Sequence, residues 1–371
     1  EISPRDWSSD VCSSDLRLHA RLDSDLERPA RVVTLVDGRV VDEQERTLAA
    51  GDNVIDWNFD LDEPRLWWPW SLGEQPLVDV TVRIVVDQQI SHERTLRTGL
   101  REIAVQDWIF SVNGERLFVK GANLAPTRAM LGEATPGELK RDIELARDAG
   151  LDLVRVHGHV SRPELYDAAD ELGVLVWQDF PLQWGYARQI RRQAVRQAEA
   201  MVDVLGHHPS IAMWCAHNEP MALSIGDGAE FDPRKLALPF LAAQMLPTWN
   251  KSVLDRWVKR ALEKSDETRP VIAHSGVLPH LPMLDGTDTH LYFGWYHGTE
   301  RDLPEFAARI PRLVRFVSEF GAQAVPDSTD FIDVDRWPDL DWDSLRRRHG
   351  LQKEIFDRHV PPAAFTTFDE W

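Results

Sequence analysis

Two glutamates stand where strongly apolar stretches of the chain end. Glu219 follows Asn218 in IAMWCAHNEP (211–220), and Glu319 lies in LVRFVSEFG (313–321). A single glutamate is usually a solvated surface charge, but a carboxyl group that directly follows an apolar run sits at the edge of a core. A pair of such groups is the minimum for hydrolysis of a glycosidic bond, because one acid protonates the leaving oxygen while one carboxylate attacks the anomeric carbon. The pattern therefore favours a two-carboxylate hydrolase.

Apolar strands that alternate with amphipathic helices surround these glutamates from Gly99 onward. The start of one helix is predicted by three residues: Thr135 as N-cap, Pro136 at the first helical position and Glu138 three residues after the cap. Strands are predicted near 117–122, 151–156, 174–178, 211–215, 271–274, 287–292 and 313–318. This order predicts a (β/α)8 TIM-type barrel over 99–371, incomplete at its last strand. A doubly wound sheet is the alternative, although no Gly-rich phosphate loop follows any of the strands.

In a barrel of this kind the active site lies at the carboxyl ends of the strands. The residues at those ends, in chain order, are Asn123, Arg155, His157, Asp179, Asn218, Glu219, His274, His290 and Glu319. The two glutamates fall on the fourth and seventh strands, so we expect them to face each other across the barrel mouth.

The residues before the barrel have the pattern of a small β-sandwich. Residues 17–98 alternate short apolar runs with turns, such as Asp37-Gly38 between RVVTLV and RVV, and we interpret them as a partial immunoglobulin-like domain. Residues 1–16, EISPRDWSSDVCSSDL, are rich in Ser and Asp and lack apolar periodicity. We expect them to be a non-native or disordered leader.

The composition of the chain argues against several classes of protein. The chain of 371 residues has a net charge of −19, which argues against a nucleic-acid partner. No stretch approaches the roughly 18 apolar residues of a membrane span. The two cysteines, Cys12 and Cys215, indicate no disulfide framework, and the 15 tryptophans suit either a core or the stacking of sugar rings.

Several segments resemble glycoside hydrolase family 2. WCAHNEP resembles the strand that carries the acid/base of that family, and VSEFG the strand that carries the nucleophile. LVRVHGHVSRPELYDAADELGVLVWQDFP resembles the second and third barrel strands, RLWWPWSLGEQPLVDV the end of the preceding immunoglobulin-like domain, and RTGLREI with FSVNGERLFVKGAN the entry into the barrel. The resemblance runs in order from about residue 60 to 325.

The resemblance implies roles for individual residues. Glu219 would be the general acid/base, Glu319 the nucleophile, Asn218 a ligand of the hydroxyl next to the anomeric carbon, and Arg155 a group that orients Glu319. A second set would contact or support the sugar: His290, Trp295 and Tyr296 after the sixth strand, with Asn123, His157, Asp179 and Trp214 around the mouth. The resemblance implies a retaining exo-acting β-glycosidase with an oligosaccharide or glycoside as substrate, no cofactor and no metal.

Within the family the resemblance is to the β-mannosidase branch, on the strength of WQDF and LWWP. The chain departs from that branch at three positions, where His157 and Leu124 replace Trp and His217 replaces Asn. Because these positions shape the sugar site, exo-β-glucosaminidase or another family 2 β-glycosidase stays open. The resemblance also implies a fragment that lacks the N-terminal sugar-binding domain and the C-terminal end of the barrel.

Two rival interpretations belong to other classes. His157-Gly158-His159, with His274, His290 and Asp179 at strand ends, could serve a metal-dependent hydrolase, because imidazoles two residues apart can share an ion. A carbohydrate-binding relative that keeps the fold without the reaction is the second rival. The presence of both glutamates with Asn218 and Arg155 argues against it.

Overall fold

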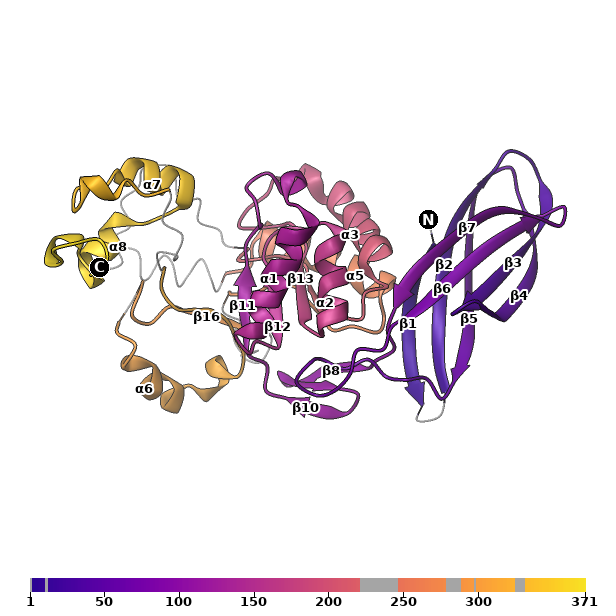
Figure 1. Ribbon diagram of the computed structural model, residues 1–371, viewed down its shortest axis with the longest axis horizontal. Helices are drawn as coiled ribbons and strands as arrows, with labels where there is room; N and C mark the ends of the chain where they lie inside the picture. The colour runs from indigo at the N-terminus through magenta and orange to yellow at the C-terminus, as the bar shows by residue number, and fades with distance from the viewer. Residues whose placement is uncertain (1, 11–12, 221–245, 278–287, 297, 324–330) are drawn as a thin grey trace. The chain divides into compact units, whose positions relative to one another are not determined.

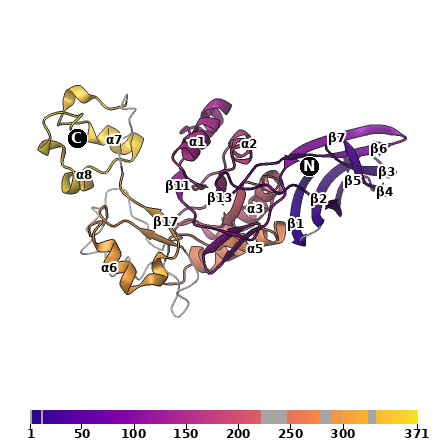
Figure 2. The ribbon, with the colours of Figure 1, turned by 60° about the horizontal axis from the view of Figure 1, so that its bottom comes forward.

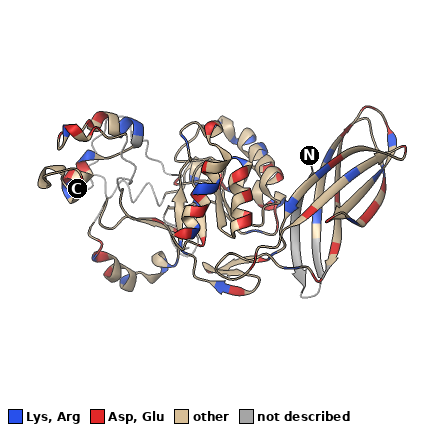
Figure 3. Ribbon diagram, viewed as in Figure 1, with Lys and Arg blue, Asp and Glu red and all other residues tan. Residues whose placement is uncertain are grey.

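The structure is a computed structural model that describes residues 2–10, 13–220, 246–277, 288–296, 298–323 and 331–371 (Figure 1). The chain divides into two compact units. The first comprises residues 1–225 and 243–287, and the second comprises 226–242 and 288–371. No helix of the described residues is long and apolar enough to cross a membrane. Acidic and basic residues both recur along the helices and strands of the first unit (Figure 3), so the net charge of −19 is not confined to one segment.

The first unit begins with the predicted β-sandwich, whose two antiparallel sheets have the orders β1-β2-β5 and β4-β3-β6-β7 (Figure 1). Its strands are β1 (Ile2–Asp10), β2 (Ser13–Ser24), β3 (Arg28–Val36), β4 (Arg39–Leu48), β5 (Gly51–Asp62), β6 (Val78–Val86) and β7 (Gln89–Thr98). The hairpin between β3 and β4 turns at Asp37 and Gly38, both with positive φ, as a type I′ turn requires.

Alternate residues of the two sheets form the sandwich core. Leu18 of β2 and Val82 of β6 are almost fully buried in the same apolar cluster. Trp57 of β5 reaches across to β3, where its indole N–H donates to Thr34 Oγ1 at 2.9 Å, so this buried polar group is satisfied between the sheets.

Residues 1–16 differ from the expected loose leader. Residues 2–10 form β1, which pairs with β2 in an antiparallel register from Ile2 opposite Ala20 to Asp10 opposite Ser13. Leu16 is buried in the sandwich core, so the regular fold begins before residue 17. Backbone pairing to an existing strand requires no apolar periodicity, which is why the Ser- and Asp-rich sequence did not predict this strand.

A three-stranded meander leads into the barrel segment. Its strands are β8 (Ile103–Gln106), β9 (Ile109–Val112) and β10 (Glu115–Leu117). The barrel strand predicted at 117–122 is displaced as a result: Leu117 ends β10, and the first parallel strand is β11 (Gly121–Leu124). The apolar run at 117–119 thus belongs partly to the meander.

Five parallel strands then follow in sequence order, β11-β12-β13-β14-β15, with helices on one face (Figures 1 and 2). The strands after β11 are β12 (Leu153–Val156), β13 (Leu175–Asp179), β14 (Ile211–Cys215) and β15 (Val271–Ile272), and the helices are α1 (Pro136–Asp148), α2 (Pro163–Leu172), α3 (Arg191–Leu205) and α5 (Asp255–Ser265). The capping box of Thr135 and Glu138 is present at α1, as predicted. One cluster joins the helices to the sheet through residues such as Ile143, Val156 and Val258, so the opposite face is left for polar side chains.

The segment between β5 and β6 of the sandwich is held against the parallel-sheet region by two tryptophans. Trp67 is fully buried and donates its indole N–H to the Asp170 carbonyl at 2.9 Å, while Trp70 donates to the Leu151 carbonyl at 2.8 Å. Gly173 ends α2 with φ 72°, and a Cβ there would lie 2.6 Å from the backbone nitrogen of Trp70. Only glycine permits this approach.

The second unit contains a parallel pair and several helices. β16 (Thr289–Leu291) pairs with β17 (Val317–Phe320), and α6 (Asp302–Arg309) lies between them in the chain. α7 (Trp342–His349) and α8 (Lys353–His359) follow, in a cluster of buried aromatic and aliphatic side chains that includes Trp295, Leu345 and Phe356. All seven predicted parallel strands are therefore present in the described residues, five in the first unit and two in the second.

Candidate active site

Arg155 is the centre of a buried polar network on the sheet face that the helices do not cover. Its Nε donates to both carboxylate oxygens of Asp179 at 3.1 Å, and its Nη2 donates to Asn218 Oδ1 at 2.7 Å. Asp179 also accepts from Trp177 Nε1 at 2.9 Å and from the Gly158 backbone at 3.1 Å. Arg155 and Asp179 are almost completely buried, so each charge depends on the other. Asp179 thus holds the Arg155 guanidinium in place.

Asn218 and Glu219 extend the fourth parallel strand beyond its last ladder residue. Asn218 N–H donates to the Leu182 carbonyl at 2.8 Å, and Glu219 N–H donates to the Ser275 carbonyl at 3.0 Å. Both neighbouring strand ends therefore hold this segment. Glu219 has a positive φ of 43°, and its Oε2 accepts from Trp184 Nε1 at 3.2 Å. The first unit brings together Arg155, Asp179, Asn218 and Glu219 at the carboxyl ends of adjacent strands.

Glu319 has its own set of partners within the second unit. It lies on β17 opposite His290 of β16, and its side chain is largely buried. Glu319 Oε2 accepts a hydrogen bond from the Tyr292 hydroxyl, and Oε1 lies 3.4 Å from His290 Nε2. His290 also lies 3.8 Å from Asp288 Oδ2. A carboxylate between a hydroxyl and an imidazole is held in one orientation, which suits a group that must attack along a defined line.

Trp214, predicted to contact or support the sugar, does not face the open side of the sheet. Its side chain is fully buried in the cluster between the sheet and the helices, and its indole N–H donates to Asp266 Oδ2 at 2.7 Å. Successive side chains of a strand point to opposite faces, so Trp214 faces the helices while its neighbours Met213 and Cys215 face the other way.

The ring of Trp295, also predicted to contact or support the sugar, belongs to the aromatic core of the second unit. Trp295 is buried, with Phe356 at 5.1 Å and His359 stacked at 5.9 Å between ring centroids. Tyr296 is partly buried beside the same core and contacts Tyr292 edge-on at 5.1 Å. Of this predicted segment, His290 is the residue that contacts Glu319.

Asn123 and His157 lie at the ends of the first two parallel strands, as predicted. Asn123 is exposed on β11 in register with Arg155, and His157 is partly buried just after β12, where its N–H donates to the Leu124 carbonyl at 3.1 Å. Their roles toward a sugar stay predictions.

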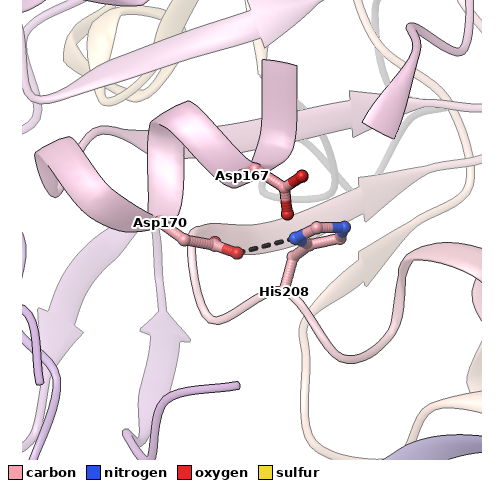
Figure 4. A group of neighbouring side chains, drawn as sticks. All are labelled: Asp167, Asp170 and His208. Atoms are coloured by element: carbon pink, nitrogen blue, oxygen red, sulfur yellow. Dashed lines mark hydrogen bonds and ion pairs between the residues drawn. The ribbon is translucent and has the colours of Figure 1, made fainter. Parts of the chain in front are cut away.

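One group in the first unit has the side chains of a metal site. Ligand atoms of Asp167, Asp170 and His208 lie within 4.8 Å of one another, and Figure 4 shows the Asp167 carboxylate beside the His208 ring. Both oxygens of Asp170 are already occupied, Oδ2 by His208 Nδ1 at 2.6 Å and Oδ1 by the Ser210 backbone N–H at 3.0 Å. The group therefore joins α2 to the loop before β14. Burial raises the pKa of Asp167.

The His157-Gly158-His159 pattern does not form a metal centre in the first unit. His159 is buried, its Nδ1 lies 3.0 Å from the His157 carbonyl oxygen, and burial lowers its pKa. Among the described residues, neither His157 nor His159 belongs to a group of three ligand atoms close enough to share an ion.

Comparison with known protein families shows to which family this chain belongs. The model of the glycosyl hydrolases family 2, TIM barrel domain, matches residues 103–310, and a second model of glycosyl hydrolases family 2 matches residues 6–101. The chain belongs to glycosyl hydrolases family 2. The barrel and the preceding sandwich domain predicted from the sequence are thereby confirmed.

Individual relatives of this family 2 chain are β-mannosidases. It is 29% identical over 301 residues to β-mannosidase B of Emericella nidulans, covering 74% of this chain and 34% of that protein. It is 28% identical over 356 residues to β-mannosidase B of Thermothelomyces thermophilus, covering 84% and 40%. The crystal structure of β-D-mannosidase from Dictyoglomus thermophilum has a TM-score of 0.69 at 21% identity, over 88% of this chain and 40% of that one. The chain therefore spans less than half the length of these relatives.

Two residues that contact the candidate catalytic glutamates were not identified from the sequence. Tyr292 lies two positions after His290, so strand alternation places both on one face, and this periodicity could have identified it. Trp184 follows the third parallel strand by five residues, in a loop without regular periodicity. The position of Trp184 shortly after a strand end is the one sequence signal that could have identified it.

Proposed function

We propose that this chain carries the catalytic centre of a retaining, exo-acting β-glycosidase of the β-mannosidase type, with Glu319 as nucleophile and Glu219 as general acid/base. The observation that carries the proposal is the position of the two glutamates. Each lies at the carboxyl end of a parallel strand within a family 2 chain, and each side chain accepts a hydrogen bond from an aromatic residue. Such strand ends are where barrel enzymes place their catalytic groups.

The proposed reaction has two steps, and both glutamates act in each. In the first, the Glu319 carboxylate attacks the anomeric carbon while Glu219 gives its proton to the glycosidic oxygen, so the leaving group departs as an alcohol. In the second, Glu219 takes a proton from water, the water oxygen attacks the same carbon, and the Glu319 carboxylate is released. A retaining mechanism requires the two carboxyl groups to lie about 5–5.5 Å apart, which we predict for these residues.

Arg155 and Asn218 would position the substrate and the charges around it. Asp179 fixes the Arg155 guanidinium in one orientation. Its positive charge would then favour the ionised form of the nucleophile without a change of side-chain rotamer. The Asn218 oxygen already accepts from Arg155, which leaves its amide N–H groups to donate to a sugar hydroxyl. Removing either side chain should therefore raise the barrier of the chemical step.

The sugar is proposed to be a β-mannoside. This assignment follows the names of the relatives, which are called β-mannosidases. His217 and His157 differ from the residues usual in that branch, so an exo-β-glucosaminidase or another β-glycosidase activity is the alternative. A panel of aryl β-glycosides of mannose, glucose, galactose, glucosamine and glucuronic acid discriminates between them by relative kcat/KM.

Covalent labelling tests the reaction class. A 2-deoxy-2-fluoro-β-mannosyl fluoride should form a stable glycosyl ester on Glu319, detected by mass spectrometry of proteolytic peptides. Glu319→Gln should abolish the label, whereas Glu300→Gln, at an exposed glutamate of the same unit, should retain it. A label on another residue, or none while the fold is intact, would contradict the proposal.

A further inference from the structure

The loop after β13 places an exposed tryptophan directly on the side chain of Glu219. Trp184 is 57% exposed, unlike Trp67, Trp177 and Trp214, which are buried. Its indole Nε1–H nevertheless donates to Glu219 Oε2 at 3.2 Å. The only polar atom of the Trp184 side chain is hydrogen-bonded to the candidate catalytic carboxyl group. The flat apolar face of the ring is therefore exposed for contact with another ring.

Hydrogen bonds of the backbone hold this loop against the fourth strand. Trp184 N–H donates to the Asn218 carbonyl at 3.0 Å, and the Tyr186 N–H donates to Asn250 Oδ1 at 2.9 Å. Trp184 itself has a φ of 64°, and Glu219 has 43°. Bulky residues rarely adopt positive φ because the conformation is strained, so the contacts around both residues must impose it.

His217 is the buried support beneath the tryptophan. Its ring is fully buried, and Nε2 lies 3.1 Å from the Trp184 carbonyl oxygen. A carbonyl oxygen only accepts, so Nε2 carries the hydrogen. The ring also contacts Tyr186 edge-on at 6.1 Å between centroids. The departure from the Asn of the β-mannosidase branch thus coincides with the residue that fixes the Trp184 loop.

The chemistry of an indole N–H determines what this contact does. The indole nitrogen donates and cannot accept, so Oε2 of Glu219 is the oxygen that accepts in both ionisation states. Because the carbonyl oxygen of a protonated carboxyl group is the better acceptor, this hydrogen bond favours the transferable proton on Oε1. An acid/base must reach the glycosidic oxygen, so an aromatic ring that is hydrogen-bonded to the acid/base lies beside the leaving group. The face of such a ring packs well against the apolar face of another ring.

We propose that Trp184, fixed by His217, is a positioning residue for Glu219 and forms one wall of the site for the leaving group, with a preference for a pyranose or aryl ring. This inference rests on the proposed function, because it assigns Glu219 as the acid/base. It adds a second determinant of specificity, on the leaving-group side of the scissile bond.

Two substitutions separate the two roles of Trp184. Trp184→Phe keeps an aromatic face and loses the N–H, so kcat/KM for a phenyl β-mannoside, a poor leaving group, should fall about tenfold, the effect of one hydrogen bond to a charged group. Its kcat/KM for a dinitrophenyl β-mannoside should stay unchanged, because kcat/KM reports the glycosylation step and this leaving group needs no protonation. Trp184→Ala should add a several-fold rise in KM for a β-mannosyl disaccharide. Trp257→Phe, at a 43% exposed tryptophan of α5, is the matched control and should equal the wild type.

The outcomes distinguish this inference from the proposed function. Equal losses for Trp184→Phe on both leaving groups, or no loss on either, would overturn the positioning role. Calorimetric titration of the disaccharide into Glu319→Gln and into the Glu319→Gln, Trp184→Ala double variant measures the contribution of Trp184 to binding without turnover. Equal affinity in these two proteins would overturn the proposal that Trp184 forms a wall of the leaving-group site. Absence of wild-type turnover on every glycoside would instead contradict the proposed function.

Discussion

Acidification should weaken the fold in part through the buried imidazole of His217. Burial lowers the pKa of His217 from its ordinary 6.5 to about 3, so the ring is neutral in the folded protein, and it donates to the Trp184 carbonyl. In the unfolded chain the same ring regains its ordinary pKa. The folded and unfolded states therefore bind different numbers of protons over a defined range of pH.

The sign follows from which state binds the proton. Between pH 6.5 and pH 3 the unfolded chain binds one proton at this site and the folded chain binds none. The free energy of unfolding is unaffected above pH 6.5 and falls as the pH drops toward 3, by about 1.4 kcal/mol per pH unit in the middle of the range. At pH 5 the loss attributable to His217 is about 2 kcal/mol relative to pH 7.

Urea denaturation of the wild type and of His217→Asn at pH 7 and pH 5 measures this loss. An asparagine amide can also donate to the Trp184 carbonyl but does not titrate, so the wild type should lose about 2 kcal/mol more than the variant between the two pH values. His159 and His207, whose pKa values burial also lowers, contribute equally to both proteins and cancel. His92→Asn, at an exposed position of β7, should behave as the wild type.

Equal losses for the wild type and His217→Asn between pH 7 and pH 5 would refute the reasoning. So would a larger loss in the variant. Either result would mean that the His217 ring accepts a proton in the folded state without losing its contacts.

Three further predictions concern the site and its supports. Glu319→Ala should abolish turnover, and Glu219→Ala should slow substrates with poor leaving groups far more than dinitrophenyl substrates; equal effects of Glu219→Ala on both would contradict its role. Asp179→Ala should lower the free energy of unfolding by about 3–5 kcal/mol, because it leaves the buried Arg155 charge unpaired; urea denaturation checks this against the exposed Asp148→Ala, and a loss as small as that of the control would show that the pair is not needed. Turnover should persist in a chelator such as EDTA, and a loss restored by added metal would favour the metal-dependent interpretation.

The elements that could be predicted from the sequence are those whose local signals agree with their burial. The strands around 153–156, 175–179 and 211–215 are buried on both faces, so their apolar runs were unambiguous. The capping box at Thr135 is a local signal and was confirmed. α2, by contrast, begins after Arg162 without a side-chain cap.

The sequence could not predict the direction in which a side chain points where tertiary packing decides it. Trp214 lies within a few residues of Asn218, yet it faces the helices, because strand residues alternate and β14 pairs with β13 through an irregular register at Val176 and Trp177. Trp295 follows β16, yet its ring packs against α8, an element 58 residues further along the chain at Lys353. Neither contact leaves a local signal, because both depend on tertiary packing.

The tryptophans that link the sandwich to the parallel sheet have a consequence for engineering. Excision of the barrel segment alone, from residue 99 onward, would remove Trp67 and Trp70 and leave the Asp170 and Leu151 carbonyls without their indole donors. An exchanged sandwich domain would fail for the same reason unless it carried both tryptophans in register with Gly173, which tolerates no side chain there. The two domains of the first unit therefore form a single foldable block, and a functional chimera must keep the whole sandwich together with the parallel sheet rather than be cut at the boundary between them.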